Sequence, residues 1–509
     1  MSPLVDSMPT NPSSTFFRPS SIVFGVVACA FFALSPTSAT AREFTWELEA
    51  TSTGDIPEPV PGAEQTACLI ADFDGDGTLD VMVAERSQGP SIAILFRDGE
   101  TWTRAVVEDE ALPIEAGGDF ADIDGDGDLD VSFGGDYRSN DVWWWENPGP
   151  PPYPASGWTR RLIKETGSNN HHDQAFGDFD GDGEIELAFW NQFGSDSLYL
   201  AEIPDSPREA GLWSRTEIFD APEDSEGLDV IDIDGDGVED LVGAGFWFEH
   251  TGGTDFTAHT IVADRSFTRS AAGQLVPGGR PEVVIVPGDA SGRLAWYEWN
   301  GSSWDENVLD DLVVHGHSLA VDDVDADGNL DIFVAEMHTP GAGDDARARI
   351  FLGDGTGSFE ERLVSTGVGH HESRLADMNG DGILDVVGKP FQTGAPALNV
   401  WIESALAPTD APSAARGGTL LTSVAPNPFN AHVEFEITLE TGTAVELVLY
   451  DLRGRQVREF VAGRSLAPGP HSFVWDGRDD AGNEAASGTY LLRASTPERE
   501  ETRAVSLVK

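Results

Sequence analysis

Short runs of apolar residues recur along the chain, each directly after an acidic, glycine-rich turn. VMVA (81–84), LAFW (187–190) and IFVA (332–335) are four residues long and contain mostly β-branched, aromatic or small apolar side chains. Runs this short, bounded by turn residues, indicate strands buried on both faces rather than helices. The pattern therefore predicts an all-β chain.

The turns before these runs are near-copies of one nine-residue motif. They are DFDGDGTLD (72–80), DIDGDGDLD (122–130), DFDGDGEIE (178–186), DIDGDGVED (232–240), DVDADGNLD (323–331) and DMNGDGILD (377–385). Each offers side-chain oxygens at positions 1, 3, 5 and 9 and a backbone carbonyl at position 7, with glycine at position 6 for the sharp turn. Flexible loops rich in carboxylates favour Ca²⁺ over Mg²⁺, so we expect six calcium ions.

Two other interpretations of these loops are an EF-hand and a plain acidic turn. An EF-hand requires a bidentate glutamate at position 12, where the first loop has Val83. Repetition at a fixed internal spacing argues against plain turns. The expected calcium ligands are Asp72, Asp74, Asp76, Thr78, Asp80, Asp122, Asp124, Asp126, Asp128, Asp130, Asp178, Asp180, Asp182, Glu184, Glu186, Asp232, Asp234, Asp236, Val238, Asp240, Asp323, Asp325, Asp327, Asn329, Asp331, Asp377, Asn379, Asp381, Ile383 and Asp385.

The interval between the fourth and fifth motifs is wide enough for one more repeat. Aligning Glu282 with position 9 places Gln274, Val276 and Gly278 at positions 1, 3 and 5, so this repeat keeps its strands and lacks the calcium ligands. Seven units of about fifty residues predict a seven-bladed β-propeller with four strands per blade. Segments such as WTRAVV (102–107) are expected to be outer strands, and FTWELEA (44–50) is expected to complete the last blade.

Charge and composition narrow the possible partners and the compartment. A formal net charge of -59 repels nucleic acid, which is therefore excluded as a partner. An apolar run (22–34) after Arg18, followed by Ala39 and Ala41, predicts a signal peptide over residues 1–41. A lipoprotein signal ending at Cys29 is the alternative. The mature chain would retain Cys68 as its one cysteine, without a disulfide or a transmembrane segment.

The loops, their spacing of about fifty residues and their glycine-rich connections resemble the FG-GAP or VCBS repeats of integrin-α-like propellers. The resemblance covers residues 42–403. It implies a calcium-binding propeller, and the family includes adhesins, carbohydrate-binding proteins and enzyme-associated domains. The fold alone does not choose among these functions.

A second domain is expected after a linker at residues 404–420. Alternating runs such as HVEFEITL (432–439) and GTYLLRA (488–494) predict a small immunoglobulin-like β-sandwich over residues 421–509. PNPFN (426–430) and YDLRGRQV (450–457) resemble the immunoglobulin-like domain of flagellar hook-capping proteins and the sorting domain of type IX secretion substrates. The resemblance implies sorting or anchoring through the secretion machinery. A purely structural sandwich is the alternative.

Three histidines occupy the same position relative to their calcium loops. His172, His317 and His371 each stand six residues before the first loop aspartate, and Glu226 stands at the matching place in the fourth repeat. The inner strand of each blade runs into its loop, so these side chains are expected to meet at the opposite mouth of the central channel. Imidazoles with a carboxylate suit zinc or another transition metal. Hydrogen bonds between blades, or simple exposure to solvent, are the alternative.

The same histidines, with Arg269 and Arg374 from matching strands, are the candidate catalytic residues. A histidine beside an arginine suits proton abstraction next to a uronate carboxylate. The arrangement resembles, at the level of fold only, propeller-shaped polysaccharide lyases and sugar dehydratases with a histidine-lined axial site. No nucleophile elbow, phosphate-binding loop or dinucleotide fingerprint is present in the sequence.

We expect a monomeric, calcium-binding propeller that is secreted or held on a bacterial cell surface. The favoured function is a binding or adhesion module for extracellular polysaccharide or a surface protein, and the alternative is a lyase acting on acidic polysaccharide. Trp143, Trp144 and Trp145 are expected to pack between blades rather than to form a sugar platform, because consecutive residues of a strand face opposite sides.

Overall fold

The computed structural model describes residues 45–99, 101–149, 157–194, 197–221, 225–263, 267–338, 343–391, 397–403, 421–425, 432–439, 442–451, 456–475, 477–478, 485, 488–496 and 499–507. The expected signal peptide and linker lie outside these residues. The chain divides into two compact units, Met1–Leu406 and Ala407–Lys509. Within the described ranges, no helix has the length and apolar character needed to cross a bilayer.

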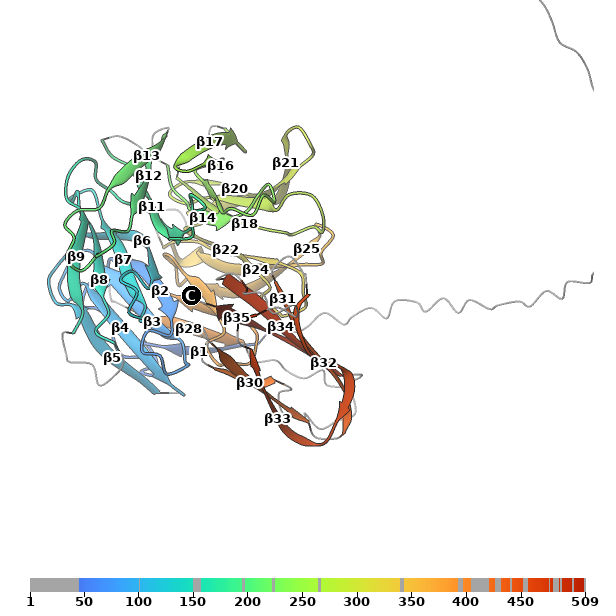
Figure 1. Ribbon diagram of the computed structural model, residues 1–509. Helices are drawn as coiled ribbons and strands as arrows, with labels where there is room; N and C mark the ends of the chain where they lie inside the picture. The colour runs from blue at the N-terminus through green and yellow to red at the C-terminus, as the bar shows by residue number, and fades with distance from the viewer. Residues whose placement is uncertain are drawn as a thin grey trace, which may run out of the picture. The chain divides into compact units, whose positions relative to one another are not determined.

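The first unit contains seven antiparallel sheets of four strands each (Figure 1). The innermost strands are β2 (Gln65–Ala71), β6 (Ile114–Ala121), β10 (Gln174–Gly177), β14 (Asp229–Ile231), β18 (Thr268–Gly273), β22 (Ser318–Asp322) and β26 (Arg374–Ala376). The second strands are β3 (Asp80–Glu85), β7 (Asp130–Gly135), β11 (Glu186–Asn191), β15 (Asp240–Gly243), β19 (Glu282–Pro287), β23 (Asp331–Ala335) and β27 (Asp385–Gly388).

The third and outermost strands complete each sheet. The third strands are β4 (Ile92–Asp98), β8 (Val142–Glu146), β12 (Ser197–Glu202), β16 (Phe246–Gly252), β20 (Ser291–Trp299), β24 (Arg347–Gly353) and β28 (Asn399–Glu403). The outermost strands are β5 (Thr101–Glu108), β9 (Thr159–Lys164), β13 (Arg215–Asp220), β17 (Asp255–Thr260), β21 (Trp304–Val314), β25 (Phe359–Thr366) and β1 (Trp46–Ala50). A single 3₁₀ turn, η1 (Gly343–Asp345), precedes β24.

The sheets form a closed ring. Each innermost strand contacts the innermost strand of the next sheet, from β2 through β6, β10, β14, β18, β22 and β26, and β26 contacts β2 again. The expected closure by the N-terminal strand is confirmed, because β1 pairs with β28 from Trp46 opposite Glu403 to Ala50 opposite Asn399. First and last segments of the propeller thus share one blade, which leaves no open end in the ring.

The hydrophobic core lies between neighbouring blades. One cluster joins Leu69 and Phe73 of the first blade to Phe133 and Trp145 of the second. Trp144, next in sequence to Trp145, faces the other way and packs in the cluster with the third blade. The tryptophan run is therefore interior to the ring, and the predicted all-β fold with repeated four-stranded sheets is confirmed.

The second unit has two sheets around one core. One sheet contains β29 (Leu421–Ala425), β30 (Val433–Leu439) and β33 (Gly469–Trp475), and the other contains β32 (Gln456–Leu466), β31 (Thr443–Asp451), β34 (Gly488–Thr496) and β35 (Arg499–Leu507). Phe435 and Trp475 of the first sheet pack with Leu447 and Leu492 of the second. This two-sheet arrangement is the predicted β-sandwich.

Candidate functional site

The acidic loops connect the innermost strand of each blade to the second strand. Every second strand begins at loop position 9, and in the calcium-free fifth repeat it begins at Glu282, as the alignment predicts. In the first four loops, ligand atoms from positions 1, 3 and 9 lie within 4.8 Å of one another; these triplets are Asp72, Asp74 and Asp80; Asp122, Asp124 and Asp130; Asp178, Asp180 and Glu186; and Asp232, Asp234 and Asp240.

The residue at position 9 also ties three parts of its blade together. Asp385 accepts the amide of Met378 at 2.9 Å inside the loop and the amide of Glu403 at 2.7 Å on the third strand. Glu282 in the fifth blade keeps the contact within the loop, accepting the amide of Val276 at 3.1 Å. The sequence predicts only a calcium-ligand role for position 9. The signal for its second role, as a hydrogen-bond acceptor that holds the strands together, is that the calcium-free repeat retains a carboxylate at this position.

The loops fit a calcium ion because their carboxylates crowd together in a partly buried setting. Burial, followed by repulsion from Asp74, raises the pKa of Asp80 to about 8. Burial also raises the pKa of Asp130 to about 8. Among the described residues, the inner oxygens Asp122 Oδ1 and Asp178 Oδ1 are buried and have no hydrogen-bond partner. Crowded, poorly solvated carboxylates with unused oxygens are what a hard divalent cation stabilises.

The fifth blade fills its loop with protein donors instead. Gln274 Nε2 donates to the carbonyl oxygens of Val276 at 2.6 Å and Gly278 at 3.2 Å. The guanidinium of Arg280 lies over the rings of Trp247 and Trp299, with its central carbon 4.5 Å and 5.1 Å from their centroids. These contacts give a physical reason why this turn keeps its shape without acidic ligands.

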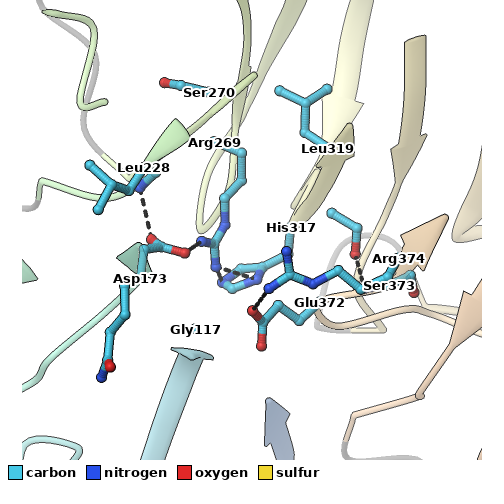
Figure 2. Close-up of a pocket in the computed structure, with 13 residues that line it drawn as sticks. Gly117, Asp173, Leu228, Arg269, Ser270, His317, Leu319, Glu372, Ser373 and Arg374 are labelled. Atoms are coloured by element: carbon cyan, nitrogen blue, oxygen red, sulfur yellow. Dashed lines mark hydrogen bonds and ion pairs between the residues drawn. The ribbon is translucent and has the colours of Figure 1, made fainter. Parts of the chain in front are cut away.

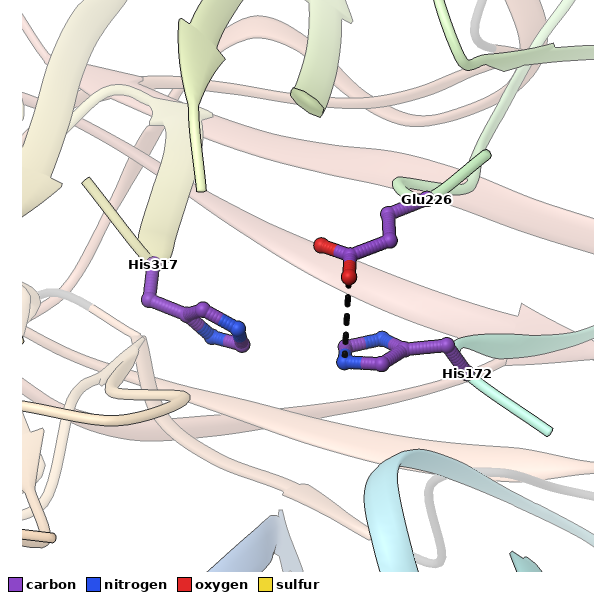
Figure 3. Close-up of side chains that lie close together, drawn as sticks. All are labelled: His172, Glu226 and His317. Atoms are coloured by element: carbon purple, nitrogen blue, oxygen red, sulfur yellow. Dashed lines mark ion pairs between the residues drawn. The ribbon is translucent and has the colours of Figure 1, made fainter. Parts of the chain in front are cut away.

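At the start of the innermost strands, the predicted histidine cluster comes together in a buried position. His172 Nδ1 lies 3.0 Å from Asp173 Oδ2, and His172 Nε2 lies 3.8 Å from Glu226 Oε1 (Figure 3). The ring of His317 lies 5.5 Å from that of His172, measured between centroids. His371 stacks on His317, with centroids 4.2 Å apart. The four predicted residues therefore converge from four blades.

Asp173 organises this cluster and was missed by the sequence analysis. Its carboxylate pairs with Arg269 Nη1, accepts the amide of Gly227 at 2.8 Å and contacts His172. Its backbone φ is +50°, a left-handed conformation that glycines adopt at the matching positions 117 and 227. A non-glycine residue held in this conformation is strained, and such strain concentrates at functional sites.

A small polar cavity of about 80 Å³ adjoins the cluster, and His317 belongs to both (Figure 2). Asp173, Arg269, His317, Glu372 and Arg374 all line it. Arg374 Nη2 donates to Glu372 Oε1 at 2.9 Å, and 44% of the Arg374 side chain stays accessible. Arg374 is thus an available cation facing the channel, and the other oxygen of Glu372 is buried without a partner among the described residues.

Two buried basic side chains lie against ring nitrogens of His317 and His371. Arg269 Nη2 lies 2.8 Å from His317 Nδ1, and Lys389 Nζ lies 3.1 Å from His371 Nδ1. Lys389 also donates to the carbonyls of Gln65 and His371. The guanidinium of arginine and the ammonium of lysine donate hydrogen bonds and cannot accept them, whereas a neutral imidazole has one lone pair that can accept. His317 and His371 are therefore hydrogen-bond acceptors in this arrangement.

Ligand atoms of His172, Glu226 and His317 lie within 4.8 Å of one another, so three of the four predicted metal ligands are grouped. A zinc ligand needs a free imidazole lone pair, whereas Arg269 Nη2 lies 2.8 Å from Nδ1 and 3.2 Å from Nε2 of His317. The positive charge of Arg269 at this place opposes zinc binding. Burial, together with Arg269, lowers the pKa of His317 well below its ordinary value. Burial and Lys389 do the same for His371. The charges at this mouth are already balanced by protein groups.

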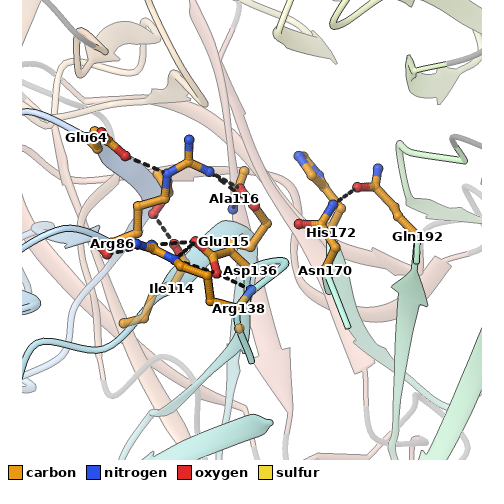
Figure 4. A network of polar contacts seen from close by, with 12 residues as sticks. Glu64, Arg86, Ile114, Glu115, Ala116, Asp136, Arg138, Asn170, His172 and Gln192 are labelled. Atoms are coloured by element: carbon orange, nitrogen blue, oxygen red, sulfur yellow. Dashed lines mark hydrogen bonds and ion pairs between the residues drawn. The ribbon is translucent and has the colours of Figure 1, made fainter. Parts of the chain in front are cut away.

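A polar network surrounds the cluster on the side of the first three blades (Figure 4). Arg86 Nε pairs with Glu64 at 2.9 Å, and Arg86 Nη1 pairs with Glu115 at 3.3 Å. Gln192 Nε2 donates to Glu226 Oε1 at 2.8 Å, which connects the third blade to the fourth. Of these contacts, the hydrogen bond from Gln192 to Glu226 joins the network to the cluster.

The charge state of His172 predicts a pH dependence of stability. Burial alone lowers its pKa, but Glu226 and Asp173 outweigh burial and raise the pKa to about 9. Because this folded-state pKa lies above the ordinary value of 6.5, the charged imidazole stabilises the fold fully below about pH 6.5 and loses that contribution as the pH rises through 9. At saturating calcium, the free energy of unfolding should fall between pH 7 and 9 by on the order of 2 kcal/mol more in the wild type than in His172→Gln. Equal pH slopes in urea titrations of the two proteins would contradict this charge assignment.

Comparisons with known proteins agree with the division into repeats and a C-terminal domain. The FG-GAP-like repeat matches residues 72–133, 122–189 and 323–388, and the FlgD Ig-like domain matches residues 429–499. No curated protein matches the chain.

Two solved structures are distantly similar. A mutant of AofleA from Arthrobotrys oligospora is 12% identical with a TM-score of 0.37, over 64% of this chain and 91% of that chain. PorZ of Porphyromonas gingivalis, described as an essential bacterial surface component of the type-IX secretion system, is 12% identical with a TM-score of 0.27, over 88% of this chain and 82% of its own. Neither similarity bears on function at these scores. The chain contains FG-GAP-like repeats followed by a FlgD Ig-like domain.

Proposed function

We propose that this chain is a calcium-stabilised propeller, secreted or held at the cell surface, that binds an extracellular polysaccharide or surface protein at its channel mouth. The observation that carries the proposal is the absence of a free imidazole lone pair on His317 and His371, combined with the accessible guanidinium of Arg374. Such a polar and charged recess suits the recognition of a ligand, and the two engaged histidines are not available as free bases.

Calcium has a structural role in this proposal. The side chains at loop positions 1, 3, 5 and 9 and the carbonyl at position 7 would hold each ion, which supplies the positive charge that the crowded carboxylates lack. All protein ligands of an ion belong to one loop, and position 9 connects that loop to the second and third strands. The ions would therefore stiffen the blades at the mouth opposite the histidine cluster.

Arg374 should dominate ligand binding because it is the accessible cation of the cavity. Arg374→Gln is expected to weaken binding at least tenfold, which corresponds to about 1.4 kcal/mol. The measurement is titration of fluorescent polygalacturonate, dextran and other members of a polysaccharide panel against the full chain. Arg293→Gln is the matched control, because Arg293 is an accessible arginine that pairs with Glu306 in the calcium-free blade, at 3.3 Å.

The same panel separates binding from catalysis. A binding module retains the polysaccharide unchanged, whereas a lyase releases unsaturated products that absorb ultraviolet light. Turnover that disappears in His317→Ala or His371→Ala would overturn the binding proposal in favour of the enzyme. Equal ligand affinity in Arg374→Gln and wild type would place the binding site elsewhere.

We further propose that the C-terminal domain directs the exported chain to the cell surface through the secretion machinery. The match of residues 429–499 to the FlgD Ig-like domain supports a separate module with this position in the chain. Deleting residues 421–509 should leave the propeller out of the surface fraction when cells are fractionated. Unchanged surface delivery of the truncated chain would show a purely structural role.

A further inference from the structure

The second calcium loop differs from the first because an arginine from the next blade pairs with its carboxylates. Arg208 belongs to the connection between β12 and β13 in the third blade. Its Nε lies 2.7 Å from Asp124 Oδ2, at loop position 3, and its Nη2 pairs with Asp126 Oδ2, at position 5. The same Nε lies 2.9 Å from Glu146 Oε1 at the end of β8. One guanidinium therefore contacts two expected calcium ligands.

The oxygens that Arg208 contacts are the ones a calcium ion would need. Asp124 Oδ1 and Asp126 Oδ1 already accept backbone amides of the loop, at 3.3 Å and 3.2 Å, which leaves the Oδ2 atoms for a cation. Loop one has the same inner pattern, with Asp74 Oδ1 and Asp76 Oδ1 accepting amides at 3.1 Å and 2.8 Å. Within the described part of the chain, no arginine pairs with the Oδ2 atoms of that loop.

The guanidinium does not replace calcium fully. Asp122 Oδ1, at position 1 of the second loop, is buried and has no hydrogen-bond partner among the described residues. Asp122, Asp124 and Asp130 still present ligand atoms within 4.8 Å of one another. The loop therefore keeps the shape of a calcium site while a protein cation covers one side of it.

We propose that Arg208 competes with calcium for the second loop, which makes this loop a weaker calcium site than the first. The inference rests on the proposed calcium binding of the loops. Calcium can enter only in the fraction of molecules in which Arg208 has left Asp124 and Asp126, so the apparent affinity is the intrinsic affinity multiplied by that fraction. Because Arg208 comes from the third blade, calcium entry also opens a contact between neighbouring blades. Glu146 would then keep its ion pair with Arg161, whose Nε lies 3.0 Å from the Glu146 carboxylate. Arg161 also donates to the carbonyl oxygen of Arg208.

The test is equilibrium dialysis of the full chain across a series of free calcium concentrations. Asp122→Ala identifies the binding step of the second loop and Asp72→Ala that of the first, because each variant lacks the ligand at loop position 1. In the wild type, the second-loop step should lie at higher free calcium than the first-loop step. Arg208→Gln should move the second-loop step to about fivefold lower free calcium, since an exposed ion pair contributes little more than this factor. Arg293→Gln, which alters an ion pair distant from any calcium loop, should leave all steps unchanged.

Each outcome is decisive. If the step that Asp122→Ala removes lies at the same or lower free calcium than the step that Asp72→Ala removes, the second loop is not the weaker site. If Arg208→Gln leaves the second-loop step in place or moves it to higher calcium, Arg208 orients the carboxylates rather than competing for them. Either result overturns the inference while leaving calcium binding intact, whereas absence of any bound calcium would remove the proposed function itself.

Discussion

Removal of calcium is expected to lower the melting temperature of the full chain by more than about 10 °C. Ligands that bind only the folded state stabilise it by about 2.7 kcal/mol per site when present at a hundred times the dissociation constant, and six sites act together. The loops join the first and second strands of six blades, so the loss is spread around the ring. Without calcium, the carboxylates in each loop repel one another in a partly buried setting.

Differential scanning calorimetry with and without excess chelator measures this effect. Added calcium should restore the original melt, and magnesium should do so poorly because it demands a tighter octahedral geometry. Gln274→Ala in the fifth blade is a useful control, since its loop is closed by protein donors and its calcium dependence should be that of the wild type. An unchanged melt in chelator would show that the loops are stable as acidic turns.

Replacing Asp173 by alanine should be the most damaging single change in the channel. Its carboxylate pairs with Arg269, contacts His172 and accepts the amide of Gly227. Removing it leaves the buried guanidinium of Arg269 without its paired anion and leaves His172 with Glu226 alone. Breaking a buried ion pair in this way typically costs about 3–5 kcal/mol. Alanine also tolerates the left-handed backbone poorly, which adds to the loss.

Asp289→Asn provides the control for this variant. Asp289 is 43% exposed, and its oxygen lies 3.8 Å from His317 Nε2, so its charge is largely screened by solvent. Chemical denaturation at saturating calcium should show a large loss for Asp173→Ala and little change for Asp289→Asn. Similar small losses in both variants would mean that Arg269 and His172 find other partners.

The sequence pattern predicts the repeats well because each blade is a local unit. Loop motifs, short apolar runs and outer strands follow one another within about fifty residues. Counting from the first aspartate of each loop places His172, His317 and His371 at equivalent positions in their repeats. The alignment of Glu282 with loop position 9 also identifies the fifth repeat correctly, since β19 begins at this residue.

Contacts between different blades cannot be predicted from the sequence pattern of a single repeat. Lys389 lies at a position with no counterpart lysine in other repeats, yet it occupies the lone pair of His371. Arg208 comes from an irregular connection whose path the repeat does not fix, and it reaches the loop of the preceding blade. Arg269 and Lys389 lie at hydrogen-bond distance from His317 and His371, and the Lys389 contact does not follow from the repeat pattern.

The central claim is that six acidic loops bind calcium and stabilise a binding propeller. Its most direct test is the calcium content of the chelator-stripped full chain after dialysis against saturating calcium, measured by elemental analysis per mole of protein. We predict six ions per chain, and five after Asp122→Ala. A content of zero or one ion at saturating calcium would contradict the account.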